Sequence, residues 1–208
     1  MEVRKIPKRI ALDLIRNHHY SRRCHPIIWH AFGVFDGLKL LGVATYRTPP
    51  SPTICIGPCG REYRNEVIEL NRLFLVENRK NLASLLIGRS MKLLPAPAIV
   101  ISYSDTAVSH HGYIYQASNF LYTGKTAAVK EANTGAGWHW RAGWKGYQLT
   151  GETRPSSQKH RYVYFVGNRR EVKERRRKMR YPVLPYPKGD NETYDTRLDL
   201  YKEEVCLL

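Results

Sequence analysis

Residue types that can move protons gather directly after one apolar run of the sequence. The run "PAIVI" is followed by Ser104 and Asp105, and then by His110, His111 and Tyr115. A carboxylate, an imidazole, a phenol and a hydroxyl that meet at one place can transfer protons to and from a substrate. Because ligands bind beyond the carboxyl ends of buried strands, we take Ser104, Asp105 and Tyr115 as candidate catalytic residues.

A second group of such residues ends the first predicted helix. In "IPKRIALDLIRNHHY" the apolar residues fall on one helical face, and the segment closes with His19 and Tyr20. If this end faces the same crevice as Asp105, nitrogen and oxygen atoms suited to iron come together. We keep three interpretations open. His19, Tyr20 and Asp105 are iron ligands, or His19 and Tyr20 assist catalysis by Asp105 as general base, or the group is structural.

The elements that must position these residues follow from the spacing of apolar residues. After the first helix, Asp36-Gly37 between two apolar runs predicts a hairpin. "TPPSPTICIGPCG" is expected to be a loop because of its prolines. Further along, the spacing predicts strands at "NEVIELNRLFLV", "PAIVISYS", "LYTGKTA" and "HRYVYFVG", and helices at "NLASLLIGRSMKLL", "SHHGYIYQASNF" and "REVKERRRKM".

The order of these elements predicts the fold class. The strand–helix–strand crossover implies a parallel strand pair, whereas the hairpin implies antiparallel neighbours. We therefore expect an α/β (α+β) fold with a mixed, mostly antiparallel central sheet. It would contain a parallel, splayed strand pair, with helices on both faces and a basic C-terminal elaboration.

One of the parallel strands leads into a helix that offers an anion site. This helix starts near Asn81, and the free N–H groups and dipole of a first turn favour phosphate. A phosphate of a carrier cofactor would fit there, although an ordinary capped helix with a solvated basic turn is the alternative. The candidate cofactor-binding residues are Arg72, Arg79, Asn81, Ala83, Ser84 and Asn119.

The formal net charge of +16 is unevenly distributed. Residues 141–188 hold 14 Lys and Arg against 3 acidic residues, whereas residues 189–208 hold 2 basic and 6 acidic residues. A basic stripe attracts phosphates by counterion release, and the aromatic rings interleaved with it can stack on bases. This pattern favours nucleic-acid binding over a merely solvated basic surface. The candidate nucleic-acid contacts are Lys159, Arg161, Arg175, Arg176 and Arg177.

Size and hydropathy bound the class of protein further. A chain of 208 residues suits one domain of moderate size. No apolar run approaches the ~18–20 residues that a membrane span needs, and the N-terminus lacks the apolar core of a secretory signal. We expect a cytoplasmic protein without a membrane partner; the sequence does not specify an oligomeric state.

The order of elements, with "GYIYQASNFLYTG" as a late helix and strand, resembles the GNAT acyltransferase fold. In that family the pyrophosphate of acetyl-CoA lies at the N-terminus of the helix that precedes this segment. The resemblance implies acetyl-CoA or a related CoA donor bound at "NRKNLAS", where Ala83 is the only small match to the family's glycine-rich turn. It also implies Tyr115 as proton donor to a leaving thiolate.

Longer segments resemble the phage Mom family over roughly residues 10–188. The resemblance implies a phage enzyme that converts the N6 amine of adenine in DNA to a carbamoylmethyl-substituted amine. That product shields the genome from restriction nucleases, in the cytoplasm of the host cell. The segments are "HHYS" (18–21), "IELNRLFL" (68–75), "NLASLLIGRSMKLLP" (81–95), "SYSDTAVSHHGYIYQASNFLYTG" (102–124) and "KHRYVYFVGNRREVKERRRKMRYPVLPYPK" (159–188).

The resemblance and the composition together predict three parts of the chain. Residues 1–128 would form a GNAT-like catalytic core, and residues 129–188 a basic aromatic elaboration that completes the sheet and binds double-stranded DNA. Residues 189–208 would form an acidic tail. Two alternatives remain at this point: an acetyl-CoA-dependent N-acetyltransferase acting on another amine, and a non-catalytic nucleic-acid-binding protein.

The implied reaction is demanding. The lone pair of the adenine amine is delocalised into the ring, and a general base alone contributes ~10²–10⁴ in rate. Acyl transfer would give an amide, whereas the family's product is joined through a CH₂ carbon, which is why iron stays among the interpretations. The amine also lies inside the base stack, so the enzyme must extrude the base or act on unpaired DNA.

Overall fold

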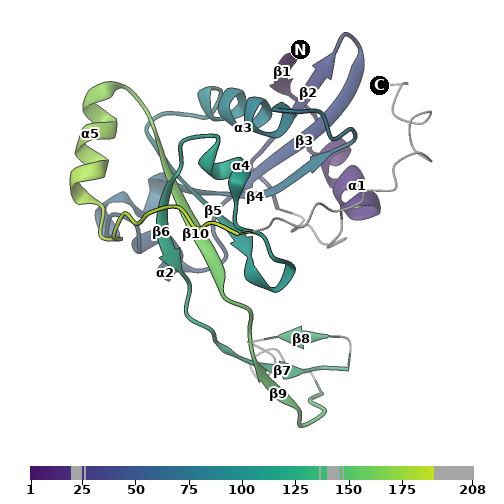
Figure 1. Cartoon of the computed structure of the whole chain (residues 1–208), viewed down its shortest axis with the longest axis vertical. Coiled ribbons are helices and arrows are strands. Elements are labelled where there is room, and N and C mark those ends of the chain that lie inside the picture. Colours follow the sequence, from purple (N-terminus) through teal and green to yellow (C-terminus); the bar gives the residue numbers. More distant parts are fainter. Residues whose placement is uncertain (20–24, 26, 136, 140–145, 147, 190–208) are drawn as a thin grey trace.

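The protein is described here by a computed structural model that covers residues 1–19, 25, 27–135, 137–139, 146 and 148–189. Its body is a seven-stranded sheet with the order β1-β2-β3-β4-β5-β10-β6 (Figure 1). Among these neighbours only β4 and β5 are parallel. The strands are β1 (Glu2–Lys5), β2 (His30–Asp36), β3 (Lys39–Arg47), β4 (Val67–Leu75), β5 (Ala98–Asp105), β6 (Leu121–Lys125) and β10 (Lys159–Val166).

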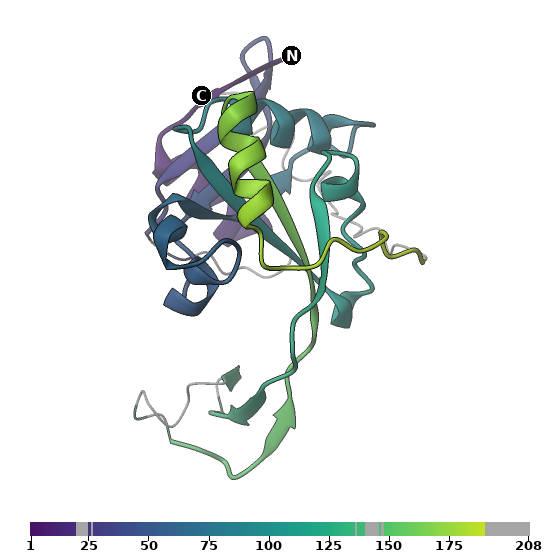
Figure 2. The same cartoon turned by 90° about the vertical axis from the view of Figure 1, so that its left-hand side faces the viewer.

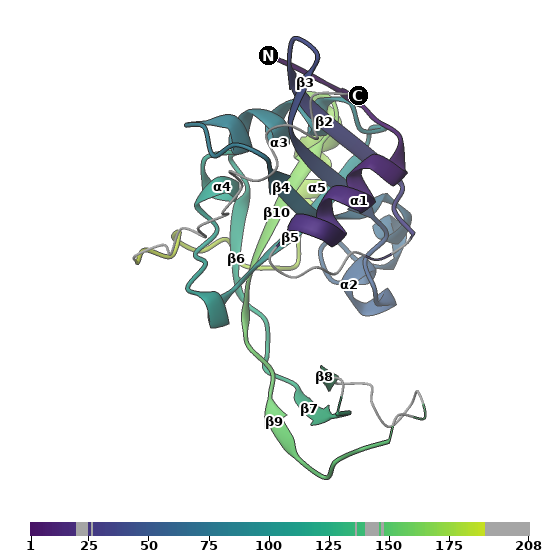
Figure 3. The ribbon, with the colours of Figure 1, turned by 90° about the vertical axis from the view of Figure 1, so that its right-hand side faces the viewer.

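Helices cover both faces of the sheet. Of the longer helices, α3 packs on one face, and α1 and α5 lie on the other (Figures 1 and 3). The predicted fold class, a mixed and mostly antiparallel sheet with helices on both faces, is therefore confirmed. The helices are α1 (Lys8–His18), α2 (Pro52–Ile56), η1 (Arg61–Glu66), α3 (Leu82–Lys92), η2 (Thr106–Val108), α4 (Tyr113–Gln116) and α5 (Arg169–Lys178).

Three local predictions need correction. The first strand, β1, was not expected from the sequence, and the segment expected as a loop contains α2, because Ser51 caps the Thr53 N–H and Pro52 opens the helix. The helix expected over "SHHGYIYQASNF" is confined to α4. Left-handed backbone at Ser109 and Gly112 delays its start, since such a conformation interrupts a helix.

A ribbon extends the sheet away from the body. Beyond β6 and β10 the chain continues into β7 (Lys130–Asn133), β8 (Trp138–His139) and β9 (Thr153–Pro155), which form a second sheet with the order β8-β7-β9. We call the described residues of this projecting part, 126–135, 137–139, 146 and 148–158, the arm (Figures 1 and 2). None of the described helices is both long and apolar enough to cross a membrane.

Candidate active site

The parallel strands β4 and β5 separate soon after they pair. Their pairing runs only from Val67 opposite Ile99 to Glu69 opposite Ile101. Just beyond this point β4 carries an extra residue, Asn71, in its pairing with β3. Because a bulge bends a strand and increases its twist, this extra residue accounts for the divergence of β4 from β5.

The divergence opens a cavity of about 510 Å³ between the middle of β4 and the carboxyl end of β5. We call it the splay pocket. It brings together six of the predicted site residues, from β4, β5, α4, β10 and the end of α1. Its lining consists of His19, Glu69, Leu70, Asn71, Arg72, Leu73, Tyr103, Ser104, Asp105, His110, Gly112, Tyr113, Ile114, Tyr115 and Lys159.

Asp105 ends β5 at the mouth of this pocket. One carboxylate oxygen accepts a hydrogen bond from the Ala107 N–H at 3.0 Å, which fixes the side chain at the start of η2. The other carboxylate oxygen lies 3.8 Å from the ammonium of Lys159, its cross-strand neighbour on β10. The carboxylate is therefore oriented by the backbone and partly balanced by one cation, while it still faces the cavity.

His19 enters the pocket from the end of α1, where its N–H caps the helix by donating to the Ile15 carbonyl at 3.1 Å. The residue is only 8% exposed. Burial, together with the charges of Arg72 and His110, lowers the pKa of His19 from 6.5 to about 4. At neutral pH the imidazole is therefore uncharged and acts as a hydrogen-bonding group.

This lowered pKa predicts a pH dependence of the free energy of unfolding. The unfolded chain binds a proton at His19 near pH 6.5, whereas the folded protein resists protonation down to about pH 4. The free energy of unfolding is therefore highest above pH 6.5, and it falls as the pH drops from 6.5 to about 4. Between pH 7 and pH 5, wild type should lose about 2 kcal/mol more than His19→Gln in urea unfolding. If the difference in free energy of unfolding between wild type and His19→Gln is the same at both pH values, the pKa of His19 is not lowered.

Ser104 and Gly112 form a tight corner of the pocket. The Ser104 side chain is buried, and its hydroxyl oxygen has no hydrogen-bond partner among the described residues. Gly112 has a left-handed φ of 73°, and a Cβ there would lie 2.9 Å from that hydroxyl and 2.6 Å from Cε2 of Tyr162. An unpaired buried hydroxyl is costly, so Ser104 is available to bind a polar atom of a ligand.

Tyr115 lies on α4 with its ring packed against Phe120 and Tyr162. Its hydroxyl donates to the Tyr103 carbonyl at 3.5 Å, at the limit of hydrogen bonding. The phenol therefore borders the pocket from a buried and well-packed position, as the sequence predicts.

Glu69 lines the pocket but is not among the predicted site residues. Its carboxylate pairs with Arg47 at 3.0 Å, and burial raises the pKa of Glu69 despite that neighbouring charge. The sequence does contain a signal, because Glu69 is a charged residue that alternates with the apolar Ile68 and Leu70 in a strand. A buried carboxyl with a raised pKa is a second group that can exchange protons here.

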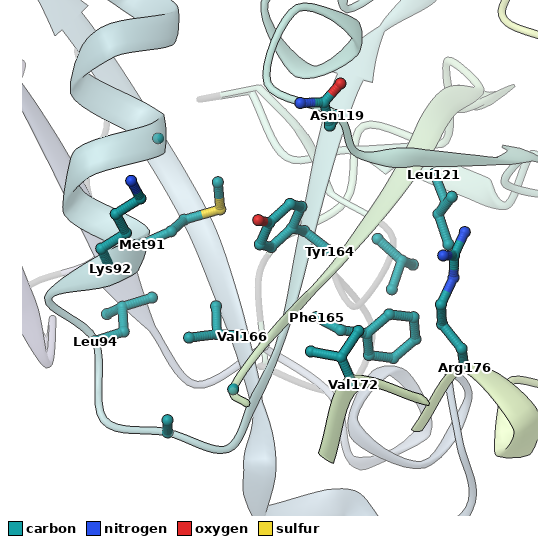
Figure 4. A pocket seen from close by; sticks show the side chains of 14 residues that line it. Met91, Lys92, Leu94, Asn119, Leu121, Tyr164, Phe165, Val166, Val172 and Arg176 are labelled. Carbon is teal, nitrogen blue, oxygen red and sulfur yellow. The ribbon is translucent and has the colours of Figure 1, made fainter. Parts of the chain in front are cut away.

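The predicted phosphate-binding residues are split by the structure. Arg72 lies in the splay pocket, whereas Asn81, Ala83 and Ser84 stand at the start of α3, where the Asn81 side chain makes no capping bond. Asn119 instead lines a different cavity of about 580 Å³, together with Met91 and Tyr164 (Figure 4).

Arg79 needs correction as a phosphate ligand. Its guanidinium donates to Asp36 at 2.8 Å and to Glu77 at 2.7 Å. Two carboxylates thus already balance its charge, which leaves the backbone N–H groups of α3 as the predicted anion site.

Two of the predicted nucleic-acid contacts also need correction. Arg175 is 8% exposed and holds Glu66 through two hydrogen bonds of 2.9 and 2.7 Å. Arg161 donates to Thr123 and covers the ring of Tyr181 at 3.5 Å. Both guanidinium groups are occupied inside the fold, whereas Arg176 and Arg177 are exposed on α5.

Two of the three predicted iron ligands are described by the structure. His19 and Asp105 both line the splay pocket, but Tyr20 lies outside the described residues. Within the described part of the chain, no group of three or more His, Cys, Asp and Glu residues is placed to hold a metal ion. Iron therefore has no support from the described residues, and it has no part in the function proposed below.

The fold and the pocket define a mixed α/β protein with a polar cavity between splayed parallel strands. The model of the Mom protein family matches residues 1–188, and the chain belongs to this family. The family resemblance inferred from the sequence is thus confirmed.

Three individual proteins that are similar to the chain have sequence identities to it between 12% and 28%. The N-acetyltransferase from Staphylococcus aureus Mu50 is 14% identical, with a TM-score of 0.47 over 80% of this chain and 98% of that one. A Bacillus subtilis acetyltransferase in complex with CoA is 12% identical, with a TM-score of 0.44 over 80% and 97%. The methylcarbamoylase Mom of Escherichia phage Mu is 28% identical over 199 residues, which cover 86% of this chain and 80% of that protein.

Proposed function

We propose that this protein is a transferase that modifies adenine in double-stranded DNA, by joining a carbamoylmethyl group to the N6 amine. Membership of the Mom family and the name of the phage Mu relative support this proposal. The observation that carries it is the convergence of Asp105, His19, Ser104 and Tyr115 on one cavity between splayed strands. Modified adenine in phage DNA would then resist restriction nucleases in the host cell.

Each of these side chains has a role that its surroundings favour. The Asp105 carboxylate is the general base that takes a proton from the N6 amine, since it faces the cavity from a fixed position. The uncharged imidazole of His19 and the unpaired hydroxyl of Ser104 orient the amine or the incoming group by hydrogen bonds. Tyr115 is the proton donor to the leaving group.

A CoA-type donor fits the residues next to this pocket. The first turn of α3 has no side-chain cap and no acidic residue, so its backbone N–H groups at Ala83 and Ser84 are suited to a pyrophosphate. Arg72 adds a cation where the pocket begins. When bound, such a donor would have to carry the carbamoylmethyl unit with a leaving group on its CH₂ carbon. The bond from N6 to that carbon would form as the bond to the leaving group breaks, with the N6 proton going to Asp105 and the proton of Tyr115 going to the leaving group.

The target base must leave the duplex to reach Asp105. Extruded bases are held by stacking and by hydrogen bonds to their edges. Tyr103 and Tyr113 both line the splay pocket and offer rings for stacking. The pocket therefore combines aromatic surface with the polar groups that a purine amine requires.

Mass spectrometry of nucleosides tests this function. DNA from bacteria that express the protein should contain a deoxyadenosine in which a carbamoylmethyl group replaces one hydrogen. DNA from cells with an empty vector is the control. An acetyl increment would instead indicate an N-acetyltransferase, and unmodified DNA would indicate a non-catalytic nucleic-acid-binding protein.

A further inference from the structure

The inner part of the arm, residues 126–133 with 153–158, is a two-stranded ribbon. Thr126 and Lys159 exchange two hydrogen bonds, from Thr126 N–H to the Lys159 carbonyl at 2.8 Å and from Lys159 N–H to Thr126 Oγ1 at 3.0 Å. Further out, Val129 and Ser156 exchange two more, at 3.0 and 2.7 Å. The ribbon then passes into the β7–β9 pairing. Hydrogen bonds between the two strands along its length make the arm a projecting extension of β6 and β10 (Figures 2 and 3).

The base of the arm is hollowed beside the splay pocket. A groove of about 600 Å³ lies between the ribbon and the end of β5. Asp105 and Lys159 line both this root groove and the splay pocket. A ligand that follows the root groove therefore passes directly by the carboxylate of Asp105.

The root groove offers the groups that recognise a phosphodiester strand. Thr126 and Ser156 use their hydroxyl oxygens as acceptors for backbone N–H groups, which leaves their O–H hydrogens to donate. Lys159 and Arg154 line the groove and supply cations. Contacts from Lys, Arg, Ser and Thr to phosphate oxygens are the commonest protein–DNA hydrogen bonds.

The outer part of the arm combines charge with an aromatic ring. The guanidinium of Arg154 lies 4.3 Å above the Trp138 ring and 3.4 Å from Glu131. Lys130 is exposed on the same ribbon. The major groove of B-DNA admits a two-stranded ribbon of this kind, with side chains of the ribbon facing phosphates and base edges.

The most basic helix, α5, begins at the end of β10 that is farther from these features. Lys159 pairs with Asp105 at the start of β10, whereas Val166 pairs with Ala98 at its end, just before α5. A strand rises ~3.3 Å per residue, so these ends are about 23 Å apart. Figure 1 shows α5 and the arm at opposite ends of β10. α5 thus begins far from the splay pocket and then runs back beside β10, where Arg176 lines a cavity with Leu121 and Val163.

We propose that the arm is the DNA-binding element of the active site. Its ribbon lies in the major groove of a duplex, and the strand with the target adenine runs along the root groove, so that the extruded base enters the splay pocket past Asp105. This inference rests on the proposed function, which supplies the substrate. It assigns to the arm, and not to α5, the contacts on which modification depends.

A pair of matched double variants tests the proposal. Lys130→Gln with Arg154→Gln removes two cations from the arm, and Arg170→Gln with Lys173→Gln removes two exposed cations from α5. Affinity for a labelled duplex is measured by fluorescence anisotropy at several salt concentrations. Modified deoxyadenosine is measured by mass spectrometry in DNA from cells that express each variant.

The arm variant should reduce the slope of log affinity against log salt by about 2, because each lost phosphate contact contributes ~0.9. Its modified adenine should fall at least tenfold, whereas the α5 variant should stay within twofold of wild type. Equal losses in both variants, or full modification by the arm variant, would overturn the proposal. If wild type modifies no adenine, the proposed function fails, while an affinity loss confined to the arm variant still supports the arm.

Discussion

Asp105→Asn should lower the amount of modified adenine by about 100-fold or more, because a general base contributes ~10²–10⁴ in rate. The amide keeps the size of the side chain and can still accept the hydrogen bond from the Ala107 N–H. It cannot accept a proton from the substrate amine. DNA affinity should therefore stay within about twofold of wild type. Nucleoside mass spectrometry and anisotropy on a duplex measure the two quantities.

Asp13→Asn is the matched control for this variant. Asp13 is exposed on α1, away from the lining of the splay pocket, and the change again converts a carboxylate to an amide. Modification by this control should equal wild type. If Asp105→Asn also kept full modification, the base would have to be another carboxyl, and Glu69 with its raised pKa would take that place.

Gly112→Ala should reduce the free energy of unfolding by about 3 kcal/mol, from overpacking and left-handed backbone strain together. The added methyl would lie 2.6 Å from a ring carbon of Tyr162, a residue with no exposed surface that cannot move aside. The hydroxyl of Tyr162 also donates to the His111 carbonyl, so a shift of this ring disturbs the segment that leads to α4. Urea unfolding followed by circular dichroism measures the loss.

Gly37→Ala separates backbone strain from collision in this experiment. Gly37 also has a left-handed φ, of 59°, in the β2–β3 turn, but a Cβ there would meet nothing within 4 Å. We expect a loss of about 1 kcal/mol, the cost of the conformation alone. Equal losses in the two variants would show that the corner between Gly112, Ser104 and Tyr162 tolerates a methyl group.

The place of the splay pocket can be predicted from the sequence because it depends on strand order. A crossover between two apolar strands makes them parallel and predicts a crevice beyond their carboxyl ends, where Asp105 lies. Arg72 instead stands in the middle of β4. The bulge at Asn71 cannot be predicted in the same way. The bulge arises only because β3 pairs Tyr46 with Leu70 and Thr45 with Arg72, and the residue types around Asn71 do not specify this register.

Arg175 shows what separates a surface charge from a structural one. Val172, Arg175 and Met179 fall on one face of α5, and the two apolar members pack toward the core. This helical spacing is a signal for a buried Arg175 among its exposed neighbours. The partner of Arg175 cannot be predicted from the nearby sequence, because Glu66 is 109 residues away. A pairing over such a separation is fixed by the sheet and not by local sequence.

The position of β10 has a consequence for how the chain is made. This strand lies between β5 and β6 and pairs with β5 along its whole length, although both of its neighbours are synthesised first. Until residue 166 has left the ribosome, β5 and β6 both present unpaired edges, which are templates for association between nascent chains. Completion of the last strand therefore adds Lys159 to the wall of the splay pocket and covers the edges of β5 and β6 through which nascent chains could associate.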